Sequence, residues 1–341
     1  MKEYGSDFHF VPIYKSHGKT VRDFFPDAVY YACGRHAILD LYEQNAWNRL
    51  WVPEYFCYEV LSSMGQFGVN WCCYPDYPLA DESETILSLP FEEGDALLRV
   101  NYFGLRSKRS NQGIPVPVVE DHTHDLIGGW AQNSDADWCV ASLRKTLPLA
   151  EGGILWSPKS KKLQKTPRMT SENDDLAELR WNAMRKKTLY LEGKIDDKNE
   201  FRPVFLSTEK GFGVMGVSLM NVETFDYLSR FDIEQWYGMK KQNRNILNES
   251  LSTIATVLEP EDSNCNPFSF TLLFDTEDVR NVFRKYLIDS CVYPAILWNV
   301  PDDTTPEIMD FSKRMLSVHC DARYNREDIM QLCEIIANRG L

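Results

Sequence analysis

Short apolar runs that recur along residues 49–156 constrain the fold of this 341-residue chain more than any other feature. Each run has the length of a strand, and Ile38, Leu41 and Tyr42 repeat at helical spacing before the first of them. Apolar runs without clean alternation are typical of strands buried on both faces of a mostly parallel sheet covered by helices. The sequence therefore predicts an α/β fold, with strands at 49–53, 69–75, 96–103, 115–121, 137–143 and 152–156 and a short helix at 58–65.

The last third of the chain has a different order of elements, which reads strand, helix, strand, strand, helix. The two helices follow Thr276 and Asn325 and have acidic first turns, which suit N-capping and the helix dipole. Gly340 is placed to end the second helix. The expected strands are 268–274, 292–298 and 314–320, and further helices are expected at about 174–193 and within 222–253.

These patterns predict two domains. Residues 1–240 would form a large α/β domain that includes an N-terminal segment at 1–27, and residues 241–341 a small α+β domain. A chain of this length can bury a sizeable core in each of them.

The charge and composition of the chain argue against some classes of binding partner. A net charge of −13 argues against nucleic acid and anionic membranes, because either would repel the protein. The sequence contains no apolar run long enough to span a membrane, and residues 1–15 lack the apolar core of a signal peptide. The nine cysteines include no CxxC pair, which indicates reduced thiols in a cytoplasmic protein, and we assign no metal site.

Two polar residues follow neighbouring predicted strands in the stretches VVEDHTHD and ASLRKTLPLAEGG. Asp121 ends one apolar run, and Lys145 follows the next, just before a Pro and a Gly pair. Taken singly, the lysine would be a surface residue and the aspartate a turn former. Together at strand ends, where ligands of open α/β sheets bind, they match the needs of pyridoxal phosphate (PLP). That chemistry takes a lysine that binds the aldehyde and an aspartate that keeps the pyridine nitrogen protonated.

This stretch resembles the DegT/DnrJ/EryC1/StrS family of sugar aminotransferases, whose pattern reads roughly E-D-x-x-[HQ] and then S-x-x-K-x-l-x-x-x-G-G. The resemblance covers residues 28–156 well and 222–340 loosely, and implies the PLP-dependent transferase fold type I. It makes Lys145 and Asp121 the catalytic residues. The cofactor-binding residues that it implies are Gly34, Arg35, Phe56, Asp121, His124, Ser142 and Lys145.

Each implied role has a physical basis. The segment ACGRHAIL resembles the family's S-G-T-x-A-L, in which the N–H groups of a helix N-terminus bind the cofactor phosphate, and Ser142 would add a hydroxyl. Phe56, with Tyr55 as the alternative, would place an aromatic ring against the cofactor face. His124 would lie beside the 3′-oxygen.

One departure from the family concerns the phosphate. Family members usually carry an Asn and an Arg in a G-x-N-x-R loop that reaches the partner's phosphate, and the counterpart here, EKGFGVMGVS, has neither. We expect Arg35 to compensate, since an arginine offers a permanent charge and several donors. The alternative is that Arg35 points to solvent or pairs with an acid such as Asp40.

The resemblance implies a cytoplasmic homodimer that transfers an amino group from glutamate or glutamine to a nucleotide-linked keto sugar, in polysaccharide or deoxyamino sugar biosynthesis. Two alternatives stay open. PLP-dependent sugar dehydratases or deoxygenases of the family carry His in place of the lysine, so Lys145 speaks against that chemistry. A non-catalytic ligand-binding scaffold is the second alternative, because the Asn and Arg are absent.

Overall fold

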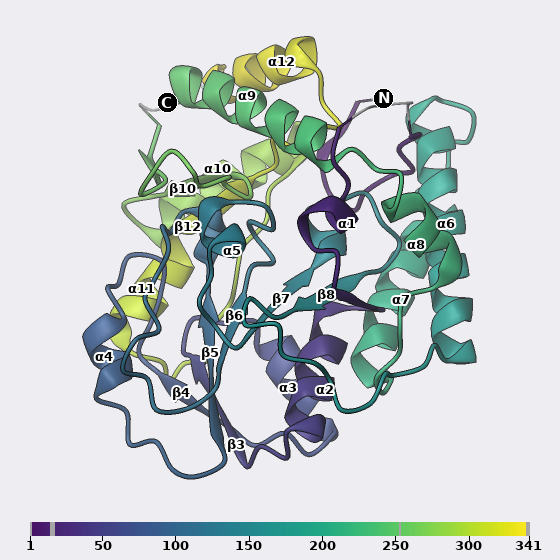
Figure 1. Ribbon diagram of the computed structural model, residues 1–341. Helices are drawn as coiled ribbons and strands as arrows, with labels where there is room; N and C mark the ends of the chain where they lie inside the picture. The colour runs from purple at the N-terminus through teal and green to yellow at the C-terminus, as the bar shows by residue number, and fades with distance from the viewer. Residues whose placement is uncertain (1, 14–17, 252–253, 339–341) are drawn as a thin grey trace.

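A seven-stranded mixed sheet forms the centre of the computed structural model, which describes residues 2–13, 18–251 and 254–338 (Figure 1). Its strand order is β2-β8-β7-β6-β5-β3-β4, and only β8 runs antiparallel to the others. The strands are β2 (Val29–Tyr31), β3 (Arg49–Pro53), β4 (Trp71–Tyr74), β5 (Asp95–Val100), β6 (Val118–Asp121), β7 (Trp138–Ser142) and β8 (Gly153–Trp156). The predicted α/β class with a mostly parallel sheet is confirmed.

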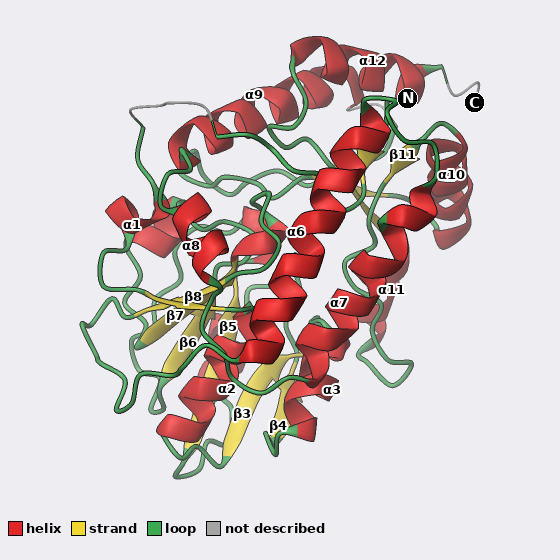
Figure 2. Ribbon diagram, turned by 90° about the vertical axis from the view of Figure 1, so that its right-hand side faces the viewer, coloured by secondary structure: helices red, strands yellow, loops and turns green. Residues whose placement is uncertain are grey.

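Both faces of the sheet are buried, which explains why the strands read as continuous apolar runs. Along β5, Leu97 packs into one core and Leu98 into the other. The core around Leu98 is covered by α2 (Gly34–Gln44) and α3 (Tyr58–Gln66), which lie near β3 and β4 in Figure 2. The core around Leu97 is covered by α1 (Val21–Phe24), α5 (Gly129–Gln132), α6 (Ser171–Leu191) and α8 (Val222–Leu228).

The C-terminal region has its own three-stranded antiparallel sheet and its own core. Thr276 and Asn325 cap their helices through side-chain oxygens, as predicted, whereas Gly340 lies outside the described residues. The elements are α9 (Ile233–Leu251), β9 (Thr256–Val257), β10 (Phe270–Leu273), α10 (Glu277–Asp289), α11 (Pro306–Arg314), β12 (Met315–Val318) and α12 (Arg326–Ala337).

Position 240 lies within α9, so the proposed domain boundary would fall inside a helix. Strand β1 (Tyr4–Gly5) pairs with β11 (Val292–Tyr293), which ties the start of the chain to the C-terminal region rather than to the large sheet. The division into two domains therefore stays a proposal.

The predicted strand at 292–298 is wrong beyond Tyr293. Pro294 has no N–H to continue a ladder, and the chain turns toward the large sheet, where the hydroxyl of Tyr55 donates a hydrogen bond to the carbonyl of Leu297. Helix α11, which begins with Pro306 in its first turn, was not predicted.

Helix α7 (Arg202–Val214) was not predicted either, and it lies against α6 (Figure 2). Its two glycines made the segment resemble a loop, but Gly211 serves packing: a Cβ there would come within 2.7 Å of Leu176 on α6. No helix in the described part of the chain is long and apolar enough to cross a membrane.

The carboxyl ends of β5, β6 and β7 meet at one edge of the large sheet because these strands are parallel. Helix α2 begins at the same edge, close to β7 and β8. A Cβ on Gly153 would overlap the carbonyl of Cys33, so only glycine lets β8 approach the start of this helix.

Candidate active site

A cavity lies at this carboxyl edge, at the position where open α/β sheets bind ligands. It is lined by the ends of β5, β6 and β7, the first turns of α2 and α3, one residue of α7 and three residues of the C-terminal region. All seven residues singled out from the sequence line it: Gly34, Arg35, Phe56, Asp121, His124, Ser142 and Lys145. Their roles remain predictions, but the fold brings them to one place.

Lys145 is the last residue of a short 3-10 turn that follows β7. The side chain of Lys145 is exposed and lines the cavity. The positive charge of Arg144 and burial lower the pKa of the Lys145 amine, and the negative charge of Glu209 opposes the shift. Among the described residues, Lys145 has no hydrogen-bond or ion-pair partner. Its amine is therefore accessible and more easily deprotonated than a lysine in water.

Asp121 ends β6, and its Oδ1 accepts a hydrogen bond of 2.8 Å from the N–H of Thr123. Thr123 in turn accepts a 2.8 Å hydrogen bond from the N–H of Ser142 on its hydroxyl, which ties the ends of β6 and β7 together. Burial raises the pKa of the Asp121 carboxyl, although the hydrogen bonds from Thr123 oppose the shift. A partly buried carboxylate that pairs with no cation in the described chain favours a ligand with a cationic N–H.

His124 is buried, and its Nδ1 accepts a 3.0 Å hydrogen bond from the N–H of Phe103. Burial and the positive charges of Lys145 and Lys240 lower its pKa to about 3, so the ring is neutral. Since Nδ1 accepts, the proton of the neutral ring lies on Nε2, which is left to donate to a ligand oxygen.

Aromatic rings form one wall of the cavity. Trp298 lies parallel to His124 with the ring centroids 5.5 Å apart, and Phe56 lies 5.9 Å from Trp298. Phe56 lines the cavity, whereas Tyr55 is fully buried beneath it and bonded to Leu297. Of the two aromatic candidates, the structure places only Phe56 where it can contact a ligand.

Gly34, Arg35 and Ser142 lie at the end of the cavity where α2 begins. A Cβ on Gly34 would come within 3.1 Å of the Ser142 Cβ, so glycine permits the close approach. Arg35 has a side chain only 11% exposed, with its Nη2 3.7 Å from Glu209 Oε1. It does not pair with Asp40, which instead accepts hydrogen bonds from Tyr31 and Gln44.

Sequence reasoning missed several lining residues. Arg144 is adjacent to Lys145, and its charge was the available signal. Glu209 and Trp298 come from segments whose local patterns indicate nothing about the site, because only long-range packing brings them there. The other residues not predicted include Cys33, Cys57, Glu59, Thr123, Phe268 and Leu297.

Glu120, His122 and Cys139 form a buried polar cluster beside the site. Glu120 Oε2 accepts a 2.6 Å hydrogen bond from Ser134 and lies 3.2 Å from His122 Nε2, and its Oε1 accepts from Asn111. With the Glu120 oxygens engaged in this way, we interpret the cluster as structural support for β6.

Solved structures of aminotransferases share this fold. Helicobacter pylori PseC, an aminotransferase involved in the biosynthesis of pseudoaminic acid, matches with a TM-score of 0.64 and 14% identity over 98% of each chain. A DegT DnrJ EryC1 StrS aminotransferase from Brucella abortus matches with a TM-score of 0.60 and 13% identity, over 94% of this chain and 90% of the other. DesI, solved in the presence of its TDP-sugar product, matches with a TM-score of 0.63 and 16% identity, over 94% and 85%.

The predicted fold, fold type I of the PLP-dependent transferases, is thereby confirmed. No protein-family model matches the sequence, and no curated protein sequence matches it either.

Proposed function

We propose that this protein is a PLP-dependent aminotransferase that acts on a sugar carried by a nucleotide. The observation that carries the proposal is the convergence of Lys145 and Asp121 on one cavity, in the fold of sugar aminotransferases. The lysine has no partner of its own among the described residues, and the aspartate has no cation. An aldehyde could bind the free amine of the lysine, and a basic ring nitrogen could pair with the aspartate.

The residues around the cavity fit PLP from end to end. Asp121 would pair with the pyridine nitrogen, Phe56 would face the ring, and His124 Nε2 would donate to the ring oxygen. At the opposite end, the first N–H groups of α2, the hydroxyl of Ser142 and the guanidinium of Arg35 would bind the phosphate.

When bound, PLP supplies an aldehyde for the amino group and a protonated ring that withdraws electrons from the reacting carbon. Lys145 supplies the amine that attaches the cofactor. With PLP bound, the Lys145 amine would serve as the base that takes the proton from the amino-bearing carbon of the donor, and the lowered pKa of this amine favours that role. Asp121 keeps its negative charge beside the ring nitrogen and so holds the proton there.

The amino donor that we propose is glutamate or glutamine, and the acceptor is a nucleotide-linked keto sugar. DesI was solved with a TDP-sugar product and PseC takes part in pseudoaminic acid biosynthesis, which supports a sugar acceptor. Lys145 favours amino transfer over dehydration or deoxygenation, and its exposure at the cavity favours an enzyme over a non-catalytic scaffold. A homodimer in the cytoplasm remains part of the proposal.

Amino transfer is tested by its first half-reaction. Protein loaded with PLP and mixed with glutamate should lose the absorbance of the bound aldehyde and release an equivalent amount of 2-oxoglutarate. A nucleotide-linked keto sugar added afterwards should restore the spectrum and gain an amino group, as seen by mass spectrometry. A sugar that loses water without gaining nitrogen would indicate dehydration, and a spectrum that neither glutamate nor glutamine changes would indicate a binding scaffold.

Arg35→Ala should weaken PLP binding by about 10- to 150-fold, because a charge-assisted hydrogen bond contributes roughly 1.5–3 kcal/mol. The side chain lies at the cavity and makes no hydrogen bond within the described chain, so its loss should leave the fold intact. Equilibrium dialysis measures the affinity, with Arg168→Ala as a control outside the cavity. An unchanged affinity would leave the phosphate to Gly34, Ser142 and the helix amides.

A further inference from the structure

Three guanidinium groups converge on the carboxylate of Glu209, which α7 brings to the cavity. Arg144 Nη2 lies 2.6 Å from Glu209 Oε1, and Arg35 Nη2 lies 3.7 Å from the same oxygen. Arg180 Nη1 lies 4.0 Å from Glu209 Oε2. Only the contact with Arg144 has hydrogen-bond length, so one carboxylate serves three cations and satisfies one of them.

Two of the arginines around Glu209 have N–H donors without an acceptor in the described chain. Arg144 is buried, lines the cavity, and has an Nε without a partner in the described chain. Arg35 makes no hydrogen bond among the described residues. Arg180 differs from them: it does not line the cavity, and its guanidinium donates to Asp7, to the carbonyl of Phe205 and to the hydroxyl of Thr208. A further anion at this end of the cavity would therefore find donors on Arg35 and Arg144.

The position of the Glu209 carboxylate is set by the packing of α7. Ser63 of α3 donates a hydrogen bond to the carbonyl of Gly213, which holds the end of α7 against α3. A Cβ on Gly213 would come within 3.0 Å of Arg35 Nη1, so this end of the helix also touches the guanidinium. Glu209 and Gly213 belong to the segment EKGFGVMGVS, in which the family's cross-dimer Asn and Arg are missing.

We propose that the Glu209 carboxylate takes, in the ligand-free protein, the place of a phosphate group between Arg35 and Arg144, and thereby sets the affinity of the site for phosphate. The inference rests on the proposed function in that the phosphate is that of PLP. A carboxylate and a phosphate accept hydrogen bonds from the same guanidinium donors. Each phosphate contact with Arg144 or Arg35 is therefore gained in competition with Glu209, and the negative charge of Glu209 repels the incoming dianion.

The test compares Glu209→Gln with the unchanged protein, using PLP, pyridoxal and inorganic phosphate as ligands. Pyridoxal has the same aldehyde and ring as PLP but no phosphate. We expect PLP and inorganic phosphate to bind about tenfold or more tightly in the variant, the size of one charge-assisted contact. Pyridoxal should change less, because it responds only to the effect of the lost charge on Lys145. The ligand-free variant should melt at a lower temperature, and inorganic phosphate should recover the difference.

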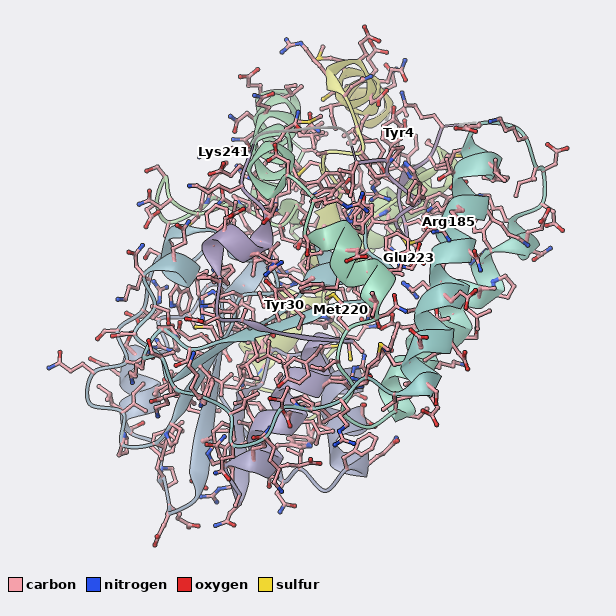
Figure 3. The ribbon with its side chains drawn as sticks, turned by 45° about the vertical axis from the view of Figure 1, so that its right-hand side comes forward. Tyr4, Tyr30, Arg185, Met220, Glu223 and Lys241 are labelled. Atoms are coloured by element: carbon pink, nitrogen blue, oxygen red, sulfur yellow. The ribbon has the colours of Figure 1, made fainter. Side chains whose placement is uncertain are left out.

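Glu223→Gln is the matched control. Glu223 of α8 pairs with Arg185 of α6 on the outside of the molecule (Figure 3), where the two side chains are 48% and 42% exposed. This substitution removes the same charge from an arginine partner, and should change none of the three affinities. If Glu209→Gln does not fold without ligand, Glu209→Asp keeps the charge but withdraws it from Arg144, and a smaller gain in phosphate affinity is expected.

Equal or weaker binding of inorganic phosphate by the folded Glu209 variants would overturn the inference, and would assign to Glu209 the role of holding Arg144 in place. Failure of the proposed function gives a different result. In that case neither PLP nor pyridoxal would attach to Lys145 in any of the proteins. The affinities of the variant and the unchanged protein for inorganic phosphate would still show whether Glu209 competes with phosphate.

Discussion

Lys145→Ala is expected to reduce amino transfer by about 10²- to 10⁴-fold or more, because the substitution removes both the attachment point of PLP and the base that moves the proton. In the unchanged protein, borohydride reduction should fix the covalent cofactor on the peptide that contains Lys145. Mass spectrometry of the digested protein locates the adduct, and the same treatment of Lys145→Ala should yield none.

Lys240 is the most similar lysine with which the assignment of Lys145 as the attachment point can be compared. It is also buried, and its Nζ has no hydrogen-bond partner in the described chain and lies 4.0 Å from the centre of the Tyr237 ring. Burial lowers its pKa as well, but it does not line the cavity. A cofactor adduct on Lys240, or on any lysine other than Lys145, would contradict the assignment. Lys210→Ala on the exposed side of α7 serves as the inert control.

Asp121→Asn should leave PLP bound and reduce amino transfer by roughly 10²- to 10³-fold, the range for losing one electrostatic contact with developing charge. The amide is isosteric and still accepts the hydrogen bond from the N–H of Thr123, so the end of β6 should be preserved. Without the negative charge, the pyridine nitrogen loses its proton and the ring withdraws electrons poorly. Single-turnover rates with glutamate measure the effect apart from cofactor binding.

Asp137→Asn is the control, because Asp137 precedes β7 at the opposite edge of the sheet and pairs there with Lys159 and Lys161. It should alter turnover little. The spectrum of bound PLP provides a second readout for Asp121, since the absorbance of the cofactor depends on the protonation of its ring nitrogen. Near-full turnover in Asp121→Asn would make Asp121 a structural residue.

The strands of the large sheet from β3 to β8 were predictable because each carries its information locally, whereas β2 at Val29–Tyr31 was not predicted. The predicted runs at 49–53, 137–143 and 152–156 coincide with β3, β7 and β8 to within a residue or two. The run at 96–103 extends past the end of β5 at Val100, because Phe103 adopts a φ of +55° that no strand accommodates. Two of the helices that were missed, α7 and α11, contain glycines or prolines that local sequence patterns assign to loops, and only the packing shows why they are tolerated there.

The sequence by itself determined the class of fold and the residues that follow its strands. Apolar runs specify a doubly covered parallel sheet, and parallel strands carry Asp121 and Lys145 to the same edge. Only the tertiary structure decided what surrounds them. Glu209 and Trp298 reach the cavity from segments more than sixty residues past Lys145. Their positions depend on helices packing against one another, a long-range interaction that leaves no periodic signal in the local sequence.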